Sequence, residues 1–209
     1  TGRGAPLSMG GAFGMLGQAL WALCGVHDGD GRSERWQRFQ ARIRAHQSPQ
    51  QAPQVVAFLA EMCQVECTTA PLPELAAARQ DLSLMHEQIG RAFVEFVRGE
   101  CEQHPVLILL EDLHWADAAT VRLVDIALAA LPEQPLFVLG LSRPEVREAY
   151  PGLWQKRQLR EIPLWGLNRR ASEKLIRGVL GNRLTPEIEA RIIAQAAGNP
   201  LFLEELIRA

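Results

Sequence analysis

Residues 106–117 read VLILLEDLHWAD, in which five apolar residues lead directly into two carboxylates, Glu111 and Asp112. A continuous apolar run of this length is typical of a parallel strand buried on both faces, and such strands belong to α/β folds. Open α/β sheets bind their ligands beyond the carboxyl ends of the strands. We therefore predict a strand over Val106–Leu110 and place the two acids at the ligand-binding end of a sheet.

Two further apolar runs follow this strand. Leu136–Leu141 and Leu159–Leu164 have the length and composition of strands, and Asp117 is a suitable N-cap for a helix over Ala118–Leu131. The order strand, helix, strand predicts a right-handed parallel crossover. The carboxyl ends of parallel strands meet at one edge of a sheet, so we expect Arg143, which follows the second run, to lie beside the acids.

Most of the remaining sequence has helical apolar spacing. We expect a Gly-rich loop over 1–10, helices over 11–24, 55–67 and 81–102, a solvated polar helix with loops within 27–52, and three further helices that follow the caps Asn168, Thr185 and Asn199. The α/β part is therefore predicted to span residues 1–166, and a small helical part residues 167–209.

Composition and charge narrow the class of protein. A net charge of −2 gives no electrostatic case for binding nucleic acid or an anionic membrane. The spacing of the four cysteines does not complete a zinc site, so we expect free, mostly buried thiols in a reducing compartment. The sequence contains neither a signal peptide nor an apolar run long enough to cross a bilayer, and we expect a cytoplasmic location.

Adjacent carboxylates at a strand end suit the hydrolysis of a phosphoanhydride, which needs a divalent cation and an oriented water. One carboxylate can hold Mg²⁺ through its waters, and the other can orient the attacking water. The alternative is a strand that ends in a polar turn without a chemical role.

Arg143 and Pro200 are weaker candidates by themselves. A guanidinium beside the acids can bind a γ-phosphate, but a solvated arginine in a strand-to-loop turn explains the residue equally well. Gly198-Asn199-Pro200 is explained locally as a helix stop followed by a helix start.

Three segments in this order, VLILLEDLHWAD, LGLSRP and AAGNPLFLEEL, resemble the ATPase module of the signal-transduction ATPases with numerous domains (STAND). This group is a branch of the AAA-type P-loop ATPases and occurs in multidomain bacterial kinases, cyclases and large LuxR-type regulators. The resemblance covers roughly residues 81–209. It implies an α/β fold with a partial parallel P-loop NTPase sheet flanked by helices, followed by a small all-helical lid subdomain.

The resemblance also implies roles for four residues. Glu111 would be the acid on the Mg²⁺ side and Asp112 the catalytic acid that polarises water, although the family often has Asp in the first position. Arg143 would sense the γ-phosphate, and Pro200 would contact the nucleotide from the lid. The implied function is Mg²⁺-dependent ATP binding with slow hydrolysis, used as a conformational switch.

One element of the family is absent from the sequence, because no G-x-x-x-x-G-K-[ST] loop occurs. We expect a Walker A segment upstream of Thr1, ATP hydrolase activity in the intact protein and an inactive segment when it stands alone. Without the strand that precedes that loop, Leu136–Leu141 and Leu159–Leu164 lack their shared neighbour, and their backbone groups need another partner.

The partners implied by the resemblance are a fused effector domain (a kinase, a cyclase or a DNA-binding regulator), helical repeats in the same polypeptide and ATP-dependent self-association. Neither direct nucleic-acid binding nor membrane binding by this segment is expected. Two hypotheses compete with a regulatory ATPase. One is a nucleotide-free interaction or scaffold module with the same fold. The other is a nucleic-acid-binding ATPase, against which the acidic balance argues.

Overall fold

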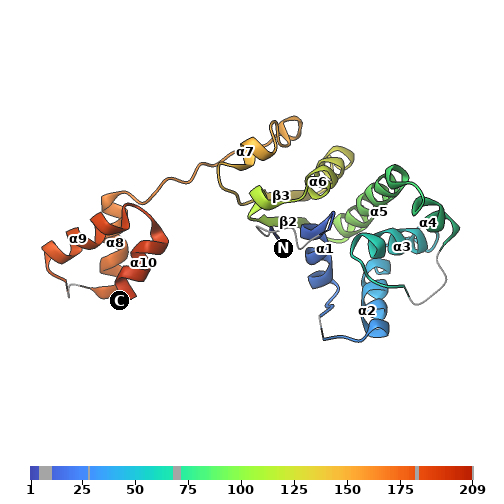
Figure 1. Ribbon diagram of the computed structural model, residues 1–209, viewed down its shortest axis with the longest axis horizontal. Coiled ribbons are helices and arrows are strands. Elements are labelled where there is room, and N and C mark those ends of the chain that lie inside the picture. The colour runs from blue at the N-terminus through green and yellow to red at the C-terminus, as the bar shows by residue number, and fades with distance from the viewer. Residues whose placement is uncertain (5–10, 28, 68–71, 182–183, 209) are drawn as a thin grey trace. The chain divides into compact units, whose positions relative to one another are not determined.

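The computed structural model describes residues 1–4, 11–27, 29–67, 72–181 and 184–208. The chain divides into two compact units, Thr1–Leu159 and Arg160–Ala209. The first unit combines helices with a small parallel sheet, and the described part of the second is helical (Figure 1). The fold is therefore mixed α/β.

The sheet of the first unit has three parallel strands in the order β1-β2-β3. They are β1 (Gly2–Arg3), β2 (Val106–Glu111) and β3 (Leu136–Gly140). In the β2–β3 pair, Val106 lies opposite Leu136, and the register continues to the end of β3. The first two predicted strands and their parallel arrangement are confirmed.

β1 corrects the prediction of a loop over residues 1–10. Gly2 pairs with Leu110, and Arg3 pairs with Glu111. A Cβ atom on Gly2 would lie 2.2 Å from the backbone oxygen of Met15, so only glycine can approach the following helix this closely. A two-residue strand is too short to show the alternating pattern from which strands are predicted. Residues 5–10 of the expected loop lie outside the described residues.

The strand predicted over Leu159–Leu164 is wrong. Residues 159–168 have neither helical nor strand structure, and Ile162 and Leu164 are 72% and 88% exposed. An apolar segment becomes a strand only when a neighbouring strand satisfies its backbone groups. Each of the three described strands pairs only within the order β1-β2-β3, and none of them pairs with this segment.

Seven α-helices are described in the first unit. They are α1 (Gly14–Leu23), α2 (Arg32–Arg44), α3 (Ala52–Met62), α4 (Pro73–Ala78), α5 (Leu82–Gln103), α6 (Ala118–Ala130) and α7 (Val146–Ala149). Short 3₁₀ turns occur at Leu113–Trp115 and Gln155–Arg157. The predicted helices are confirmed except for their ends. α4 and the short α7 were not predicted. α4 begins at Pro73, and proline is favoured in the first turn of a helix.

The polar helix within 27–52 is less solvated than predicted. Trp36, Phe39 and Ile43 of α2 are buried. Their spacing of three and four residues forms one apolar stripe, and the arginines occupy the rest of the helix surface. α2 therefore contributes to the core.

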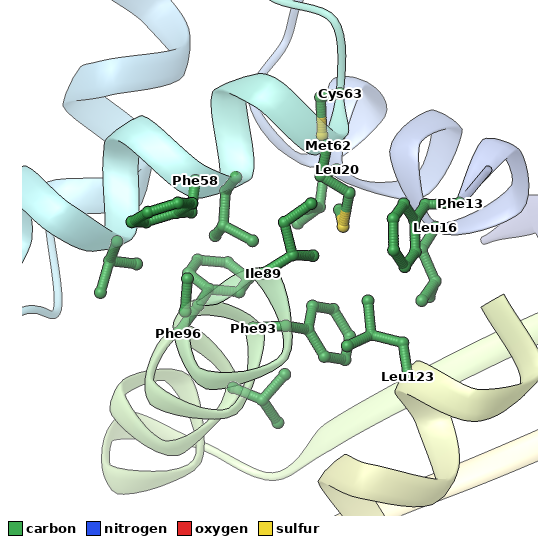
Figure 2. Close-up of a cluster of buried hydrophobic side chains, with 14 of the residues drawn as sticks. Phe13, Leu16, Leu20, Phe58, Met62, Cys63, Ile89, Phe93, Phe96 and Leu123 are labelled. Carbon is green, nitrogen blue, oxygen red and sulfur yellow. The ribbon is translucent and has the colours of Figure 1, made fainter. Parts of the chain in front are cut away.

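The core of the first unit lies between α5 and the helices packed around it (Figure 2). Phe93 of α5 faces Leu123 of α6, and Phe58 of α3 lies near Phe96 of α5 (Figure 2). Leu110 of β2 is fully buried in the same cluster. The sheet is thus fixed to the helices through its packed face.

The opposite face of the sheet is not covered by the described helices of the first unit. Ile108 and Val138 point to the packed face and contact the core cluster. Leu107, Phe137 and Leu139 alternate with them and are 60%, 64% and 40% exposed. The expectation of strands buried on both faces therefore holds for one face only.

The second unit contains α8 (Arg169–Leu180), α9 (Pro186–Ala196) and α10 (Pro200–Arg208). Asn168 and Thr185 cap the first two helices through their side-chain oxygens, as predicted. A small core of Ile176, Ala196 and Leu203 joins the three helices.

The four cysteines are free thiols, and three of them are buried. Burial raises the pKa of the Cys24 thiol to about 12, so this thiol is not activated for nucleophilic chemistry. Within the described ranges, no helix is both long and apolar enough to span a lipid bilayer.

Candidate functional site

Both predicted acids lie at the carboxyl end of β2. Glu111 is the last residue of the strand. Asp112 follows it with a φ of 54°, a left-handed conformation that is uncommon outside glycine, asparagine and aspartate. This residue ends the strand and begins the 3₁₀ turn Leu113–Trp115.

Hydrogen bonds continue past the ends of β2 and β3 and tie their following loops together. The Leu141 N–H donates to the Leu110 oxygen at 2.8 Å, and the Leu113 N–H donates to the Leu141 oxygen at 2.9 Å. The backbone N–H of Arg143 donates to Nδ1 of His114 at 3.4 Å. The loop that carries Arg143 is therefore held against the turn that follows the acids.

The side chain of Arg143 lies over an aromatic ring of the same turn. Its guanidinium carbon is 5.8 Å from the centre of the Trp115 ring, within the range of a cation–π interaction. The structure thus brings Glu111, Asp112 and Arg143 to one end of the sheet, as the sequence predicts.

Arg3 of β1 belongs to the same site, although the sequence analysis did not identify it. Its Nε lies 3.1 Å from Oδ2 of Asp112 and 3.8 Å from Oε2 of Glu111. The side chains of Arg3, Glu111 and Asp112 are 70%, 36% and 32% exposed. Because solvent screens exposed charges, these ion pairs contribute about 1 kcal/mol or less. Arg3 neutralises part of the negative charge of the acids.

Gly4 holds this end of β1 close to the acids. Its N–H donates to the Glu111 oxygen at 2.9 Å. A Cβ atom on Gly4 would lie 2.4 Å from the Asp112 backbone oxygen and 3.1 Å from Cβ of Trp115. The site therefore requires glycine here, and the Gly-rich start of the sequence was the only signal of it.

The last residue of VLILLEDLHWAD, Asp117, has a structural role. Its Oδ1 accepts hydrogen bonds from the N–H groups of Thr120 at 2.7 Å and Phe13 at 2.9 Å. The first bond caps α6, as predicted, and the second fixes the start of α1. Asp117 thereby joins two helices next to the site.

Pro200 belongs to the other unit, where it is the first residue of α10. Oδ1 of Asn199 accepts from the N–H groups of Leu201 at 3.0 Å and Phe202 at 3.3 Å, which makes Asn199 the cap of this helix. Gly198 has a φ of 81°, as expected of a glycine that ends a helix. The local explanation of Gly198-Asn199-Pro200 is thus confirmed, and a role in nucleotide binding stays a prediction.

The donor atoms at the acids suit a Mg²⁺ ion that arrives with a ligand. Mg²⁺ prefers carboxylate oxygens, water and phosphate oxygens, and proteins usually supply one or two of its carboxylates. Glu111 and Asp112 would supply these two carboxylates. No group of three or more His, Cys, Asp or Glu side chains able to hold a metal ion is found among the described residues. A cation here would also compete with Arg3 for the carboxylates.

A cavity of about 450 Å³ lies elsewhere in the first unit, between α2, α3 and α4. Trp36, Arg44, Glu61 and Arg79 are among the residues that line it. None of the four predicted site residues lines this cavity, so it lends no support to their roles.

No protein-family model and no solved structure matches the chain. The chain is 23% identical over 129 residues to an uncharacterized protein of Rhizobium meliloti (strain 1021). The match covers 62% of this chain and 12% of that protein. The chain thus spans a small part of the length of this relative.

Proposed function

We propose that the chain is part of an ATP-binding regulatory ATPase module in a larger multidomain protein, a module of the P-loop type that resembles the STAND group. The observation that carries the proposal is the gathering of Glu111, Asp112 and Arg143 at the carboxyl ends of two adjacent parallel strands. Ligands of open α/β sheets bind at this end. Two acids and an arginine are also the charged groups that phosphoryl transfer uses.

The uncovered sheet face supports the proposal independently. Parallel sheets occur almost only where helices cover both faces. Within the first unit, Leu107, Phe137 and Leu139 are 60%, 64% and 40% exposed on one face, and β3 is an edge strand of the described sheet. A further parallel strand beside β3 and a helix over this face would complete the layer. The segment that we propose for this place is the Walker A strand, loop and helix.

Each site residue has a defined part in this proposal. Glu111 would hold Mg²⁺ through its waters, and Asp112 would accept a hydrogen bond from the attacking water and orient it. Arg143 would bind the γ-phosphate oxygens, and Pro200 would have the role in nucleotide binding that the resemblance implies. Mg²⁺, when bound with ATP, supplies charge neutralisation on the β- and γ-phosphates.

Arg3 partly neutralises the acids of the ligand-free site. Its guanidinium pairs with both acids, and Mg²⁺–ATP would have to replace that pairing. Since each pair is solvent-exposed, the exchange costs about 1 kcal/mol or less. We therefore propose that Arg3 lowers cation affinity modestly and leaves binding possible.

The wider proposal follows the same resemblance. The intact protein would carry an effector domain (a kinase, a cyclase or a DNA-binding regulator) and helical repeats, and it would self-associate in an ATP-dependent manner in the cytoplasm. ATP binding with slow hydrolysis would switch between two conformations.

A second candidate function is a nucleotide-free interaction or scaffold module with the same fold. The ion pairs of Arg3 with Asp112 and Glu111 favour it, because they satisfy the acids without a cation. In this case the exposed sheet face would bind a protein partner, and the acids would have no chemical role.

The two functions are distinguished by Mg²⁺-dependent ATP binding to a longer chain that includes the upstream sequence. Isothermal titration should show ATP binding that requires Mg²⁺ and that falls at least about tenfold in Glu111→Ala, which removes the acid on the Mg²⁺ side. Asp112→Ala, which removes the acid that orients water, should slow hydrolysis more than it weakens ATP binding. Glu87→Ala, which removes an exposed acid of α5, serves as the control and should bind ATP normally. ATP binding that is absent from the longer chain, or that persists unchanged in Glu111→Ala, would contradict the ATPase.

A further inference from the structure

His114 connects the turn that follows β2 with the loop that follows β3. Its Nδ1 accepts a hydrogen bond from the Arg143 N–H at 3.4 Å. The preceding link between the same two segments is the backbone bond from Leu113 to Leu141 at 2.9 Å. The imidazole thus adds one hydrogen bond beyond the last backbone bond between these segments. This bond is made to Arg143, whose side chain the proposed function assigns to the γ-phosphate.

The hydrogen bond to Arg143 defines the tautomer of the ring. An accepting Nδ1 carries no hydrogen, so the neutral imidazole of His114 is protonated at Nε2. Nε2 is buried and has no hydrogen-bond partner among the described residues. An unpaired buried donor is destabilising. The stability of the turn alone therefore does not explain a histidine at this position.

Trp115 holds the other end of Arg143. The Trp115 ring lies 4.5 Å from the His114 ring and beneath the Arg143 guanidinium. It is 38% exposed, so the cation–π contact is at the surface and can be exchanged for a stronger ligand contact. His114 thus holds the backbone of Arg143, and Trp115 contacts its side chain.

We propose that His114 is a positioning residue for Arg143. It fixes the Arg143 backbone beside the acids, so that the guanidinium can leave Trp115 for a terminal phosphate without a rearrangement of the loop. The turn thereby gives the site its preference for a nucleoside triphosphate over a diphosphate. This role rests on the proposed function, whereas the hydrogen bond itself can be tested without a nucleotide.

The first experiment measures exchange of the Arg143 amide hydrogen by NMR in the 209-residue chain. His114→Ala should accelerate this exchange about fivefold to tenfold, because the net loss is one hydrogen bond. His114→Asn, whose side-chain oxygen can take the place of Nδ1, should restore part of the protection. His27→Ala, which changes an exposed histidine, is the control and should have no effect.

Unchanged exchange of the Arg143 amide in His114→Ala would overturn the inference. If His114→Ala loses protection throughout the chain, His114→Phe, which keeps a ring but has no acceptor atom, decides in its place. Reduced protection of Arg143 in an otherwise protected His114→Phe supports the inference, and unchanged protection of Arg143 overturns it.

The second experiment compares ATP and ADP affinity in the longer, nucleotide-competent chain. His114→Ala should lower the ratio of ATP to ADP affinity, as Arg143→Ala does, and should add little in the Arg143→Ala background. Additive losses in the double variant would show that His114 does not act through Arg143. If the unmutated longer chain binds no ATP, the proposed function fails, and the exchange measurement alone decides the contact between His114 and Arg143.

Discussion

At the scale of single residues, the core of the first unit contains a buried carboxylate, Glu100. The Glu100 side chain of α5 is 5% exposed, and its two oxygens accept hydrogen bonds from Arg42 of α2 at 2.6 and 2.5 Å. Nδ1 of His46 lies 2.9 Å from the same carboxylate. A buried carboxylate with these partners fixes α2 against α5, because its removal leaves the partly exposed Arg42 and His46 without their shared acceptor.

Glu100→Gln should therefore lower the free energy of unfolding by about 3 kcal/mol. Urea denaturation followed by circular dichroism measures this change. Glu87→Gln is the matched control on the same helix, since Glu87 forms an exposed pair with Arg91 and should cost about 0.5 kcal/mol or less. Equal effects of the two substitutions would contradict a structural role for Glu100.

The same carboxylate predicts a dependence of stability on pH. Burial raises the pKa of Glu100, but hydrogen bonds from Arg42 and His46 outweigh burial and hold the pKa below its ordinary value of 4.5. A carboxyl whose pKa is lowered on folding stabilises the fold above its unfolded pKa, and this stabilisation is lost as the pH falls through the folded pKa. The stability difference between wild type and Glu100→Gln should thus shrink as the pH falls from 5 to about 3. Urea denaturation at several pH values tests this, and a difference that stays constant over the range would contradict it.

At the scale of elements, Asp117 links two helices, whereas an ordinary cap serves one. It caps α6 through the Thr120 N–H and also binds the Phe13 N–H at the start of α1. Asp117→Ala should cost about 2 kcal/mol, at the upper end of cap substitutions. Asp81→Ala is the control, because Asp81 caps α5 alone through Ser83 and Leu84 and should cost about 1 kcal/mol. Thermal unfolding of both variants measures the difference, and a smaller cost for Asp117→Ala would contradict the double role.

The elements also show how far the sequence predicts this fold. Helix caps and apolar periodicity are local signals, so α5, α6 and α8 were found nearly to the residue. The segment Leu159–Leu164 was misassigned because a strand depends on a neighbour that its own residues do not encode. At the candidate site, the acids and Arg143 could be placed together from strand order alone. Arg3 could not, because its position depends on β1, which pairs with a strand more than a hundred residues away.

At the scale of the whole molecule, the sheet has one face packed against helices of the first unit and one face that the described helices of this unit leave open. Phe137 of β3 is 64% exposed on the open face, beside Leu107 and Leu139. Water-exposed apolar groups on a parallel sheet predict a covering layer. The proposed function assigns that layer to upstream sequence of the same polypeptide, and the exposed residues therefore have different environments in the short and the longer chain.

Phe137→Lys tests this difference directly. In the 209-residue chain the substitution should change the free energy of unfolding by less than about 1 kcal/mol, because the side chain already faces water. In the longer chain with the upstream segment it should cost about 2 kcal/mol or more, because an ammonium group would be buried under an apolar layer. Leu82→Lys, at a position 78% exposed at the start of α5, should have a small effect in both chains. Urea denaturation of the two chains gives both values. A small effect of Phe137→Lys in both would mean that the face stays open, and the upstream strand and helix would then have to lie elsewhere.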